Sequence, residues 1–491
     1  MPSAFYLPIG NPHYDWRFDS SPQLHMNQRR ISCPRGRTMG GSSAINGMVY
    51  VRGHAKDFDR WQSLGATGWA FADVLPYFRK AERATDPTRD VGYRGESGPL
   101  VTSAGTLSNP LHEAFLAAAE EAGHRRSSDL NGRQQEGFGT LAMTVRDGVR
   151  CSAASAYLAA PPANLKILRG HQAHRLRFKN GRCYGVELSR SNGQAVRVTG
   201  GRTIVACGAI GSPQLLMLSG IGPPEALSKV GIKVLADRRE VGENLRDHLE
   251  VYVQKACRQP VTLNAHLGRM GKARIGAQWL LTQRGLGATN HFETGGFIRS
   301  DHSKNWPDIQ FHFLPAAMSY SGALAGVKHG FQAHVGPMSS NARGTVRLRT
   351  DKATDAPLID FNYMSEPDDW RTFRAAIRAA REIFEQPALA RFAGREISPG
   401  KDQHSDRELD DFVRAHAESA YHPCGTCRMG SDDNAVVDPS GRVNGVDDLW
   451  VADASVFPHL TNGNLNAPTI MVAEKIADQL RGRQLPAESP A

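Results

Sequence analysis

The feature that most constrains the fold is a short apolar run that leads straight into a helix start. The run Thr203–Gly208 reads TIVACG and suits a β-strand buried on both faces of a sheet. After it, Ser212 fits a helix N-cap, Pro213 the first helical position and Gly220 the C-terminal stop. A strand that runs directly into a helix N-terminus presents backbone N–H groups to an anionic cofactor. This unit therefore predicts an α/β lobe that binds a cofactor.

A second unit of the same kind lies near the end of the chain. The run Leu449–Asp453 leads through a turn rich in glycine and asparagine to a helix that opens near Pro468. Helical spacing in that segment is marked by Ile470, Ala473, Ala477 and Leu480. We expect residues 421–480 to return to the cofactor-binding lobe formed by residues 1–250.

The middle of the chain has a different pattern. Gly344–Arg349 alternates like a half-exposed strand. One face of a long amphipathic helix is marked by Trp370, Phe373, Ile377 and Phe384, whose expected role is core packing. Residues 251–420 are therefore predicted to form a mixed α+β layer that covers the cofactor lobe.

Composition excludes several classes of protein. With 40% hydrophobic and 22% charged residues in 491, the chain is not disordered, and no apolar run reaches the roughly 18 residues of a membrane span. The net charge of +10 is spread without basic blocks, which argues against nucleic-acid binding and leaves loose attachment to a membrane surface. Seven cysteines and a start without a signal pattern predict a cytoplasmic protein.

Three further segments carry residues suited to chemistry. Gly36–Tyr50 has paired glycines that allow close backbone approach to a planar or phosphorylated ligand, with a tight structural turn as the alternative. Ala420–Gly430 holds His422, posed by Pro423, and a CxxC pair that forms at most half a zinc site. We interpret that pair as structural, with thiol redox chemistry as the alternative. Asn462, Asn464 and Asn466 exceed what helix capping needs and indicate a polar ligand.

Together these segments resemble the glucose–methanol–choline (GMC) family of flavin-dependent alcohol oxidoreductases. Gly208–Gly222 is similar to the second family signature, and Gly40–Gly53 to the first, with Met39 where a branched aliphatic residue or Trp is usual. The resemblance implies a Rossmann-like α/β FAD-binding lobe that lacks its first βαβ unit, and an α+β substrate lobe with an antiparallel sheet. Segments similar to the choline-oxidising branch of the family are Asn290–Phe297, His329–Val335, Gly394–Gly400 and Ala420–Gly430.

The resemblance also implies roles for single residues. His422 is the catalytic base, and Asn466 binds the substrate oxygen or the flavin. The implied flavin contacts are Gly40, Gly41, Ser42, Asn46, Gly47, Met48, Val49, Ala173, Cys207, Gly208, Ser212, Asp453, Ala454 and Thr469. Members that tether the flavin carry histidine where this chain has Ile45, so we expect non-covalent FAD and no metal.

For a quaternary ammonium substrate, a carboxylate and aromatic faces are needed. The resemblance places the carboxylate on Glu293, for which the alternative is an ordinary salt bridge. Tyr421, which lies beside His422, is a candidate aromatic wall, and Trp16 is a further one. The resemblance implies oxidation of choline to betaine aldehyde, and on to glycine betaine, with a quinone-type electron acceptor. A relative acting on another primary alcohol remains an alternative.

One family feature is missing from the chain. A strand followed by G-x-G-x-x-G, a helix and an acidic residue should hold the FAD pyrophosphate and ribose, yet this glycine spacing occurs nowhere in the sequence. We expect a start site placed too far downstream, or else a shortened product. The second case keeps open a flavin-free, inactive homologue.

Overall fold

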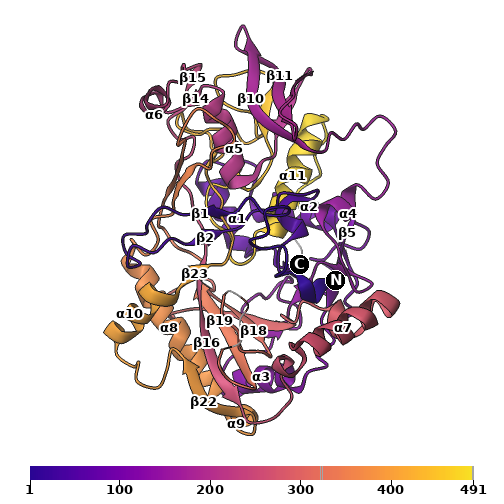
Figure 1. Cartoon of the computed structure of the whole chain (residues 1–491), viewed down its shortest axis with the longest axis vertical. Coiled ribbons are helices and arrows are strands. Elements are labelled where there is room, and N and C mark those ends of the chain that lie inside the picture. The colour runs from indigo at the N-terminus through magenta and orange to yellow at the C-terminus, as the bar shows by residue number, and fades with distance from the viewer. Residues whose placement is uncertain (321, 323–324, 489–491) are drawn as a thin grey trace.

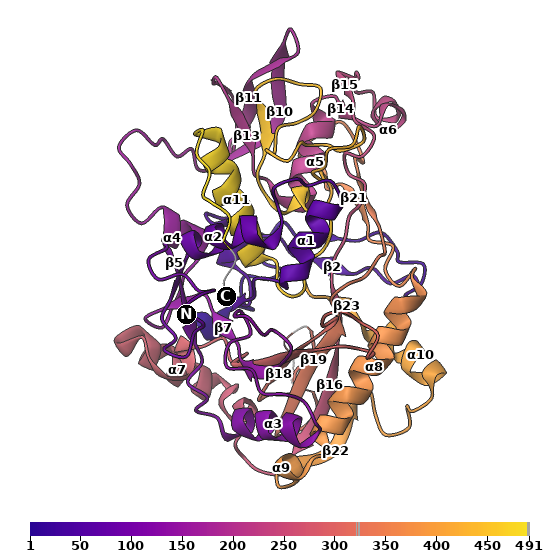
Figure 2. The same cartoon turned by 180° about the vertical axis from the view of Figure 1, so that it is seen from behind.

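The computed structural model describes residues 1–320, 322 and 325–488. The helices are α1 (Ala55–Ser63), α2 (Phe71–Ala81), α3 (Pro110–Glu121), α4 (Ala153–Tyr157), α5 (Gly208–Leu218), α6 (Pro224–Lys229), α7 (Arg269–Thr282), α8 (Pro367–Phe384), α9 (Pro387–Ala390), α10 (Asp406–His416) and α11 (Asn466–Leu480). The molecule is elongated, with α5, α6 and α11 at one end and α3, α8, α9 and α10 at the other (Figures 1 and 2). We call these ends the upper and the lower lobe.

The strands divide between the lobes in the same way. The upper lobe contains β10 (His171–Lys179), β11 (Arg182–Arg190), β12 (Ala195–Thr199), β13 (Thr203–Val205) and β24 (Leu449–Val451). The lower sheet has β6 (Gly137–Thr140), β16 (Leu249–Cys257), β17 (Thr294–Ile298), β18 (Ile309–Leu314), β19 (Gly330–Pro337), β22 (Ala393–Ser398) and β23 (Glu418–Ser419). Further pairings involve β3 (Val49–Tyr50), β4 (Glu82–Ala84), β5 (Leu100–Ala104), β7 (Ala142–Met143), β20 (Thr345–Arg347) and β21 (Leu358–Asp360).

The two predicted strand–helix units meet in the upper lobe. β13 pairs in parallel with β24, and α5 follows β13 directly. The prediction that this strand is buried on both faces is wrong, because Ile204 is 48% exposed. In the described part of the chain β13 pairs with β24 alone, and about half of the Ile204 side chain stays exposed.

The helix after β13 begins five residues earlier than predicted, at Gly208 instead of Pro213. α5 starts at Gly208, so Ser212 lies inside it instead of capping it, and its hydroxyl accepts the Cys207 N–H at 3.0 Å. Pro213 has no N–H to give to the carbonyl of Ala209. The hydroxyl of Thr426 donates to that carbonyl at 2.6 Å instead, which joins the late histidine segment to α5.

The lower lobe is built on an antiparallel sheet, as predicted. Its strand order is β22-β16-β19-β18-β17-β6, with β23 also paired to β16. Alternate residues point to opposite faces. Buried apolar residues on one face, including Val251, Phe331 and Phe311, pack toward α8, where Phe384 meets Phe331 at 5.1 Å between ring centroids. The other face carries polar and aromatic residues.

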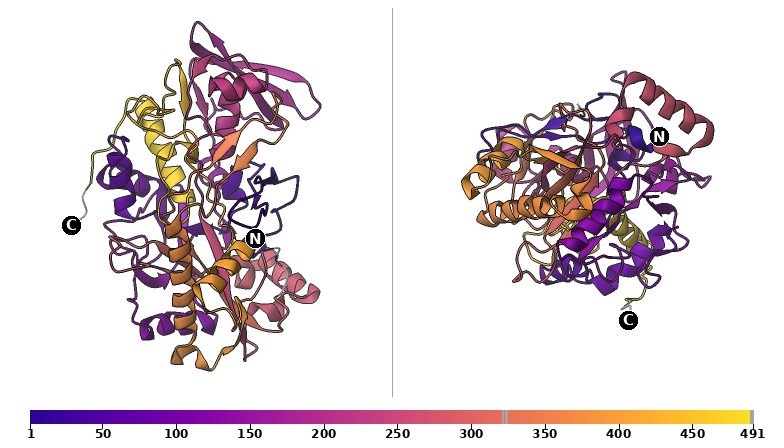
Figure 3. Two further views of the ribbon diagram at one scale, coloured as in Figure 1. Left: turned by 90° about the vertical axis from the view of Figure 1, so that its left-hand side faces the viewer. Right: turned by 90° about the horizontal axis from the view of Figure 1, so that it is seen from below.

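The lobes do not follow the predicted boundary at residue 250. β6 and α3 precede it in sequence, yet β6 pairs with β17 and α3 packs on α9 and α8 in the lower lobe (Figures 1 and 3). Conversely, β20 follows it but joins the upper lobe, where the Val346 N–H donates to the Gly242 carbonyl at 2.7 Å. The chain passes between lobes several times because sheet pairing, and not sequence order, places these segments.

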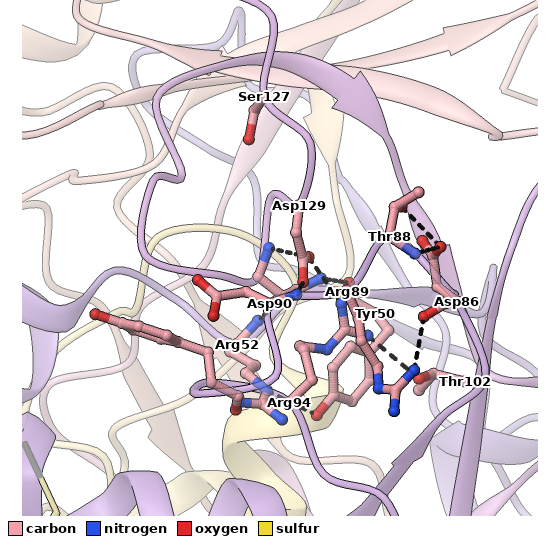
Figure 4. A network of polar contacts seen from close by, with 12 residues as sticks. Tyr50, Arg52, Asp86, Thr88, Arg89, Asp90, Arg94, Thr102, Ser127 and Asp129 are labelled. Carbon is pink, nitrogen blue, oxygen red and sulfur yellow. Dashed lines mark hydrogen bonds and ion pairs between the residues drawn. The ribbon is translucent and has the colours of Figure 1, made fainter. Parts of the chain in front are cut away.

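A buried ion network lies where β4 begins. The Glu82 carboxylate, fully buried, pairs with the guanidinium groups of Arg52 and Arg94. Arg94 also reaches Asp129 at 2.7 Å, and both of these residues are labelled in Figure 4. Thr102 donates a hydroxyl hydrogen bond to Glu82 at 2.6 Å. Burial alone would raise the pKa of Glu82, but the two guanidinium groups lower it to about 2. The carboxylate is therefore charged and paired throughout the neutral range.

Candidate active site

The site is centred on His422, which follows β23 where the two lobes meet. Its neighbour Tyr421 has φ of 66°, a left-handed conformation that turns the chain sharply before the histidine. The backbone N–H of His422 donates to the Asp247 carboxylate at 2.6 Å. Asp247 and His248 come just before β16, so the site joins the edge of the lower sheet to the late histidine segment.

A chain of hydrogen bonds fixes the proton positions on both imidazoles. His248 Nε2 lies 3.1 Å from the Met338 carbonyl, so this nitrogen carries the proton. His248 Nδ1 is then an acceptor, and it takes the Nδ1–H of His422 at 3.1 Å. His422 Nε2 is left as an acceptor, and the Asn464 amide donates to it at 3.1 Å. His422 is therefore a neutral imidazole with its lone pair on Nε2.

The electrostatics agree with this tautomer. Burial lowers the pKa of His422 well below its usual value, and the nearby His248, His312 and Arg35 lower it further. Burial also lowers the pKa of His248 to about 4. Both imidazoles consequently stay neutral at physiological pH, which a general base requires before it can accept a proton.

Asp247 was not identified from the sequence. It is buried, and its carboxylate accepts from the backbone N–H groups of His422 and His248, and from the hydroxyl groups of Tyr363 and Ser419. An acidic residue beside a histidine at the start of a strand was the available signal, but nothing in the sequence shows that it meets His422. Asp247 is a positioning residue because it holds the backbone of both histidines.

Exchanging Asp247 for asparagine should therefore lower kcat by about 10²-fold, because a displacement of roughly 1 Å at the base has that effect. We expect KM and flavin content to change little. Tyr363→Phe removes one of the four donors and serves as the milder control. Steady-state kinetics checks the split between kcat and KM; an unchanged kcat for Asp247→Asn would contradict the positioning role.

The asparagine-rich turn meets His422 through a different residue from the one expected. The side-chain amide nitrogen of Asn464 donates to His422. The side-chain oxygen of Asn464 accepts from Gln310 at 3.1 Å and from His312 at 3.3 Å. Asn466 opens α11, is half-buried, and its amide makes no hydrogen bond with any described residue. The Asn466 amide is thus free to meet a ligand, while Asn464 orients His422.

The second group of predicted residues gathers where β13 and β24 end. The Asp453 carboxylate accepts the N–H of Gly208 at 2.9 Å and the hydroxyl of Ser212 at 2.5 Å. The Ala454 carbonyl accepts the Gly425 N–H at 3.0 Å, and Cys207 is exposed. The structure brings these five predicted residues together.

The first signature forms a tight turn that leads into β3. Gly40 and Met48 have φ of 89° and 61°. The side-chain oxygen Oδ1 of Asn46 accepts the Met48 N–H at 3.1 Å and an Arg150 N–H at 2.7 Å. Ser42 accepts the Gly36 N–H at 3.2 Å. A Cβ added at Gly41 or Gly47 would meet nothing within 4 Å, so the turn is open on one side. Val49 continues into β3, where it is buried.

Two predicted flavin contacts lie on regular elements. Ala173 belongs to β10, the edge strand beside α5, at a bulge in its pairing with β11. Thr469 lies in the first turn of α11, where its hydroxyl donates to the Leu465 carbonyl at 2.6 Å. The structure assigns neither a ligand-facing role of its own.

The predicted substrate residues are not all brought to His422. The Glu293 carboxylate is buried and accepts the Leu107 N–H and the Thr289 hydroxyl, each at 2.7 Å, so it forms hydrogen bonds and not the ordinary salt bridge weighed above. Trp16 is 39% exposed, stacks on Phe18 and lies under the Arg37 guanidinium at 4.8 Å. Tyr421 stays beside His422, and its carbonyl accepts from Arg35 at 2.7 Å.

The CxxC pair is buried and unlinked. Burial raises the pKa of the Cys424 and Cys427 thiols, which leaves them protonated. The N–H of Cys427 donates to the Ser455 carbonyl at 2.7 Å, so the pair anchors this segment to the residues after β24. Among the residues that the structure describes, no three His, Cys, Asp or Glu side chains are grouped to hold a metal ion.

Comparison with known proteins decides the family. Sequence models of the GMC oxidoreductase family match residues 19–250 and 340–473. The chain belongs to the GMC oxidoreductase family. It is 50% identical to an "Oxygen-dependent choline dehydrogenase" of Brucella canis, over 98% of this chain and 88% of that protein. The comparisons do not confirm the expected loss of a leading strand–glycine–helix unit.

Solved structures agree with the family. A pyridoxine 4-oxidase from "Mesorbium loti" is 31% identical, with a TM-score of 0.88 over 99% of this chain and 91% of that one. An FAD-dependent oxidoreductase from Chaetomium thermophilum is 25% identical, with a TM-score of 0.87 over 96% of this chain and 90% of that one. The predicted two-lobe GMC fold is confirmed, and the chain is an FAD-dependent alcohol oxidoreductase.

The residues present fit an FAD molecule. Added Cβ atoms at Gly41, Gly47 and Gly208 would each meet nothing within 4 Å, so all three border open space. α5 begins at Gly208 and α11 at Asn466, and helix N-termini favour negative charge. The unpartnered Asn466 amide adds a donor and an acceptor at the start of α11. FAD supplies the acceptor for a hydride equivalent when it is bound.

Proposed function

We propose that this enzyme oxidises choline to betaine aldehyde, with hydride transfer from the alcohol carbon to FAD. The observation that carries the proposal is the buried neutral His422, whose Nε2 lone pair faces the asparagine turn. Choline as the substrate is supported by the 50% identity, over nearly the whole chain, to proteins named choline dehydrogenases.

His422 takes the proton of the substrate hydroxyl at Nε2, where it now accepts the Asn464 amide hydrogen bond. As His422 becomes a cation, its Nδ1–H keeps the hydrogen bond to the neutral His248, which Met338 anchors. The Asn466 amide donates to the substrate oxygen as negative charge develops there. Burial of the site excludes water, which strengthens each of these contacts.

The same residues act on the hydrate of betaine aldehyde, which again offers a hydroxyl on the carbon to be oxidised. We propose that glycine betaine is the final product. Product analysis by proton NMR checks this step; betaine aldehyde as the sole product after complete turnover would contradict it.

We propose that the flavin is bound without a covalent bond. Ile45 is 5% exposed and its alkyl side chain has no atom that can form a bond to the ring. Precipitation of the protein with acid should release all the flavin into the supernatant. Yellow colour that stays in the pellet would show a tether.

We further propose a quinone-type electron acceptor. The resemblance to choline-oxidising members of the GMC family supports it, while the relatives' name, "Oxygen-dependent choline dehydrogenase", makes dioxygen the competing acceptor. Turnover measured with a soluble quinone and with dissolved oxygen distinguishes the two. A rate with oxygen that equals the rate with quinone would contradict our choice.

Attachment to an anionic membrane surface is part of the same proposal, because quinones reside in lipid. Along α7, Met270, Leu280 and Leu281 are 88%, 75% and 85% exposed, and the helix carries basic but no acidic residues. The helix lies at the outer edge of the molecule (Figure 3). No helix in the described part of the chain is long and apolar enough to cross a membrane. Sedimentation with phosphatidylglycerol vesicles should be lost in Leu280→Glu; equal sedimentation of both proteins would contradict the proposal.

The substrate is tested by comparing alcohols with the flavin-loaded protein in a dye-coupled assay. We expect kcat/KM for choline to exceed that for benzyl alcohol by about 10²-fold or more, since a site built for one group rejects analogues that lack it. The second candidate is an aromatic primary alcohol, favoured by the structural similarity to a pyridoxine oxidase. A preference for benzyl alcohol would select it. Protein that lacks flavin and activity would indicate an inactive homologue.

A further inference from the structure

A group of positively charged side chains lies beside the Asp247–His248 pair, on residues that the proposed reaction does not use. Arg246 is the residue before Asp247, and it is only 2% exposed. Its backbone N–H donates to the Cys424 carbonyl at 3.0 Å, and its carbonyl accepts the Cys424 N–H at 2.9 Å. The Arg246 side chain therefore begins at the backbone junction between the Asp247 segment and the His422 segment.

The guanidinium group of Arg246 has no carboxylate partner. Three arginines are buried in the described part of the chain, and two of them, Arg52 and Arg94, share the carboxylate of Glu82. Arg246, the third, forms no ion pair with any described residue. A charge withdrawn from water in this way is costly unless an anion joins it.

Only neutral acceptors meet the guanidinium group of Arg246. Its Nε–H donates to the Asn244 side-chain oxygen at 3.0 Å, and Nη1 donates to the Ser340 carbonyl at 3.0 Å and to His459 Nε2 at 2.9 Å. Because Nε2 is an acceptor, His459 is a neutral imidazole, and burial lowers its pKa well below the ordinary value. Nη2 has no hydrogen-bond partner among the described residues, so its two N–H groups can donate to a ligand.

Two more arginines without ion pairs lie close to Arg246. Arg60, half-buried on α1, donates to the side-chain oxygen of Asn341 at 3.3 Å, and this oxygen lies 3.4 Å from His459 Nε2. Arg343 is two residues further along the chain from Asn341 and is exposed. Burial lowers the pKa of Arg246 to about 10, and the charges of Arg343 and Arg60 add to this lowering. The three guanidinium groups are thus near enough to repel one another.

The nearest carboxylates do not neutralise these arginines. Burial lowers the pKa of Arg60, and the Asp57 carboxylate only opposes that lowering. Glu366 acts on Arg246 in the same way, and neither carboxylate forms an ion pair with an arginine that the structure describes. One oxygen of Asp57 is already engaged by two backbone N–H groups, each at 2.7 Å, and burial raises the pKa of Asp57 to about 7. Three positive charges face at most two negative ones, so positive charge remains in excess.

We propose that Arg60, Arg246 and Arg343 form a binding site for a small tetrahedral oxoanion, for which inorganic phosphate is the probe. Guanidinium groups match paired phosphate oxygens, and hydrogen bonds between charged groups are about twice as strong as neutral ones. Arg343 is exposed and Arg60 half-buried, which leaves the site open to a free ion. Arg246 lies too deep to meet the phosphate of a lipid held in a bilayer.

A bound oxoanion would join three separate parts of the chain. Arg60 belongs to α1, Arg343 follows β19, and Arg246 precedes β16 beside the His422 segment. A ligand that binds only the folded protein raises its stability by mass action. This inference does not depend on the alcohol that is oxidised and goes beyond the proposed function. None of the implied flavin contacts belongs to the site.

The test is calorimetric titration of the FAD-containing protein with sodium phosphate at constant ionic strength. We expect saturable binding in wild type, and Arg246→Gln should weaken it by at least about 10-fold, because it removes the buried charge. Phosphate should also raise the unfolding temperature of wild type more than sodium chloride of the same ionic strength does. The matched control is Arg395→Gln, which removes one charge from an exposed arginine of β22 and should bind phosphate like wild type.

Each other result would overturn the inference. Equal phosphate affinity in wild type and Arg246→Gln would do so, and an equal effect of chloride would show charge screening alone. Phosphate binding that appears only after FAD is removed would mean that the cofactor's own pyrophosphate meets these arginines. If Arg246→Gln does not fold, Arg343→Gln changes an exposed residue and should also weaken binding. Loss of sedimentation with phosphatidylglycerol vesicles in Arg343→Gln would indicate a lipid phosphate in place of the free ion.

Discussion

Replacing His422 with alanine lowers kcat with choline by about 10²- to 10⁴-fold, the usual contribution of a positioned general base. Alanine leaves the Nδ1 of His248 without its donor but keeps the backbone N–H that Asp247 holds, so the fold and the flavin content should be retained. The measurement is the steady-state rate per bound flavin. His404→Ala, an exposed histidine on the lower lobe, is the control and should have the wild-type rate.

The same residue sets the pH dependence. Burial lowers the pKa of His422 well below 6.5, so the imidazole is neutral, and active, at all pH values above that lowered pKa. Activity should therefore persist at a pH where an ordinary histidine is half protonated, and fall only under more acidic conditions. An acid limb of kcat/KM centred at or above 6.5 would contradict the buried, neutral base.

Replacing Glu82 with alanine destabilises the folded protein by about 3–5 kcal/mol, the cost of leaving a buried charge without its partner. Two guanidinium groups, those of Arg52 and Arg94, lose their shared carboxylate in a place that water does not reach. The free energy of unfolding in denaturant checks this. The control is Glu113→Ala, whose partner Arg126 is 38% exposed, and it should cost about 1 kcal/mol or less.

The pH dependence of that contribution has a definite sign. The pKa of Glu82 is lowered to about 2 in the folded protein, below its ordinary value of 4.5. Its contribution to stability is therefore fully present above pH 4.5 and is lost as the pH falls toward 2. Equal stability losses for Glu82→Ala and Glu113→Ala would show that the buried network does not stabilise the fold.

Local patterns predicted the elements well. The amphipathic helix with Phe373, Ile377 and Phe384 is α8, and the alternating strand at Gly344–Arg349 is β20. The start of α5 was misplaced because Ser212 and Pro213 resemble a cap and a first turn. Only the fold shows that Thr426 replaces the hydrogen bond that Pro213 cannot make.

The sequence predicted only those site residues that lie in recognisable motifs. His422 and the residues around Asp453 carry signatures that the family resemblance identifies. Asp247 carries none, because its role depends on the pairing of β16 with β23, which no local pattern predicts. Asn464 and Asn466 lie in one turn, and which of them meets His422 is decided by side-chain direction.

The most direct test of His422 as the base in choline oxidation is a single-turnover experiment without oxygen. Choline is mixed with the oxidised, flavin-loaded protein, and the loss of flavin absorbance is followed in wild type and in His422→Ala. We predict rapid bleaching in wild type and a rate lower by about 10²-fold or more in the variant. Equal rates in the two proteins, or no bleaching of wild type by choline, would contradict the account.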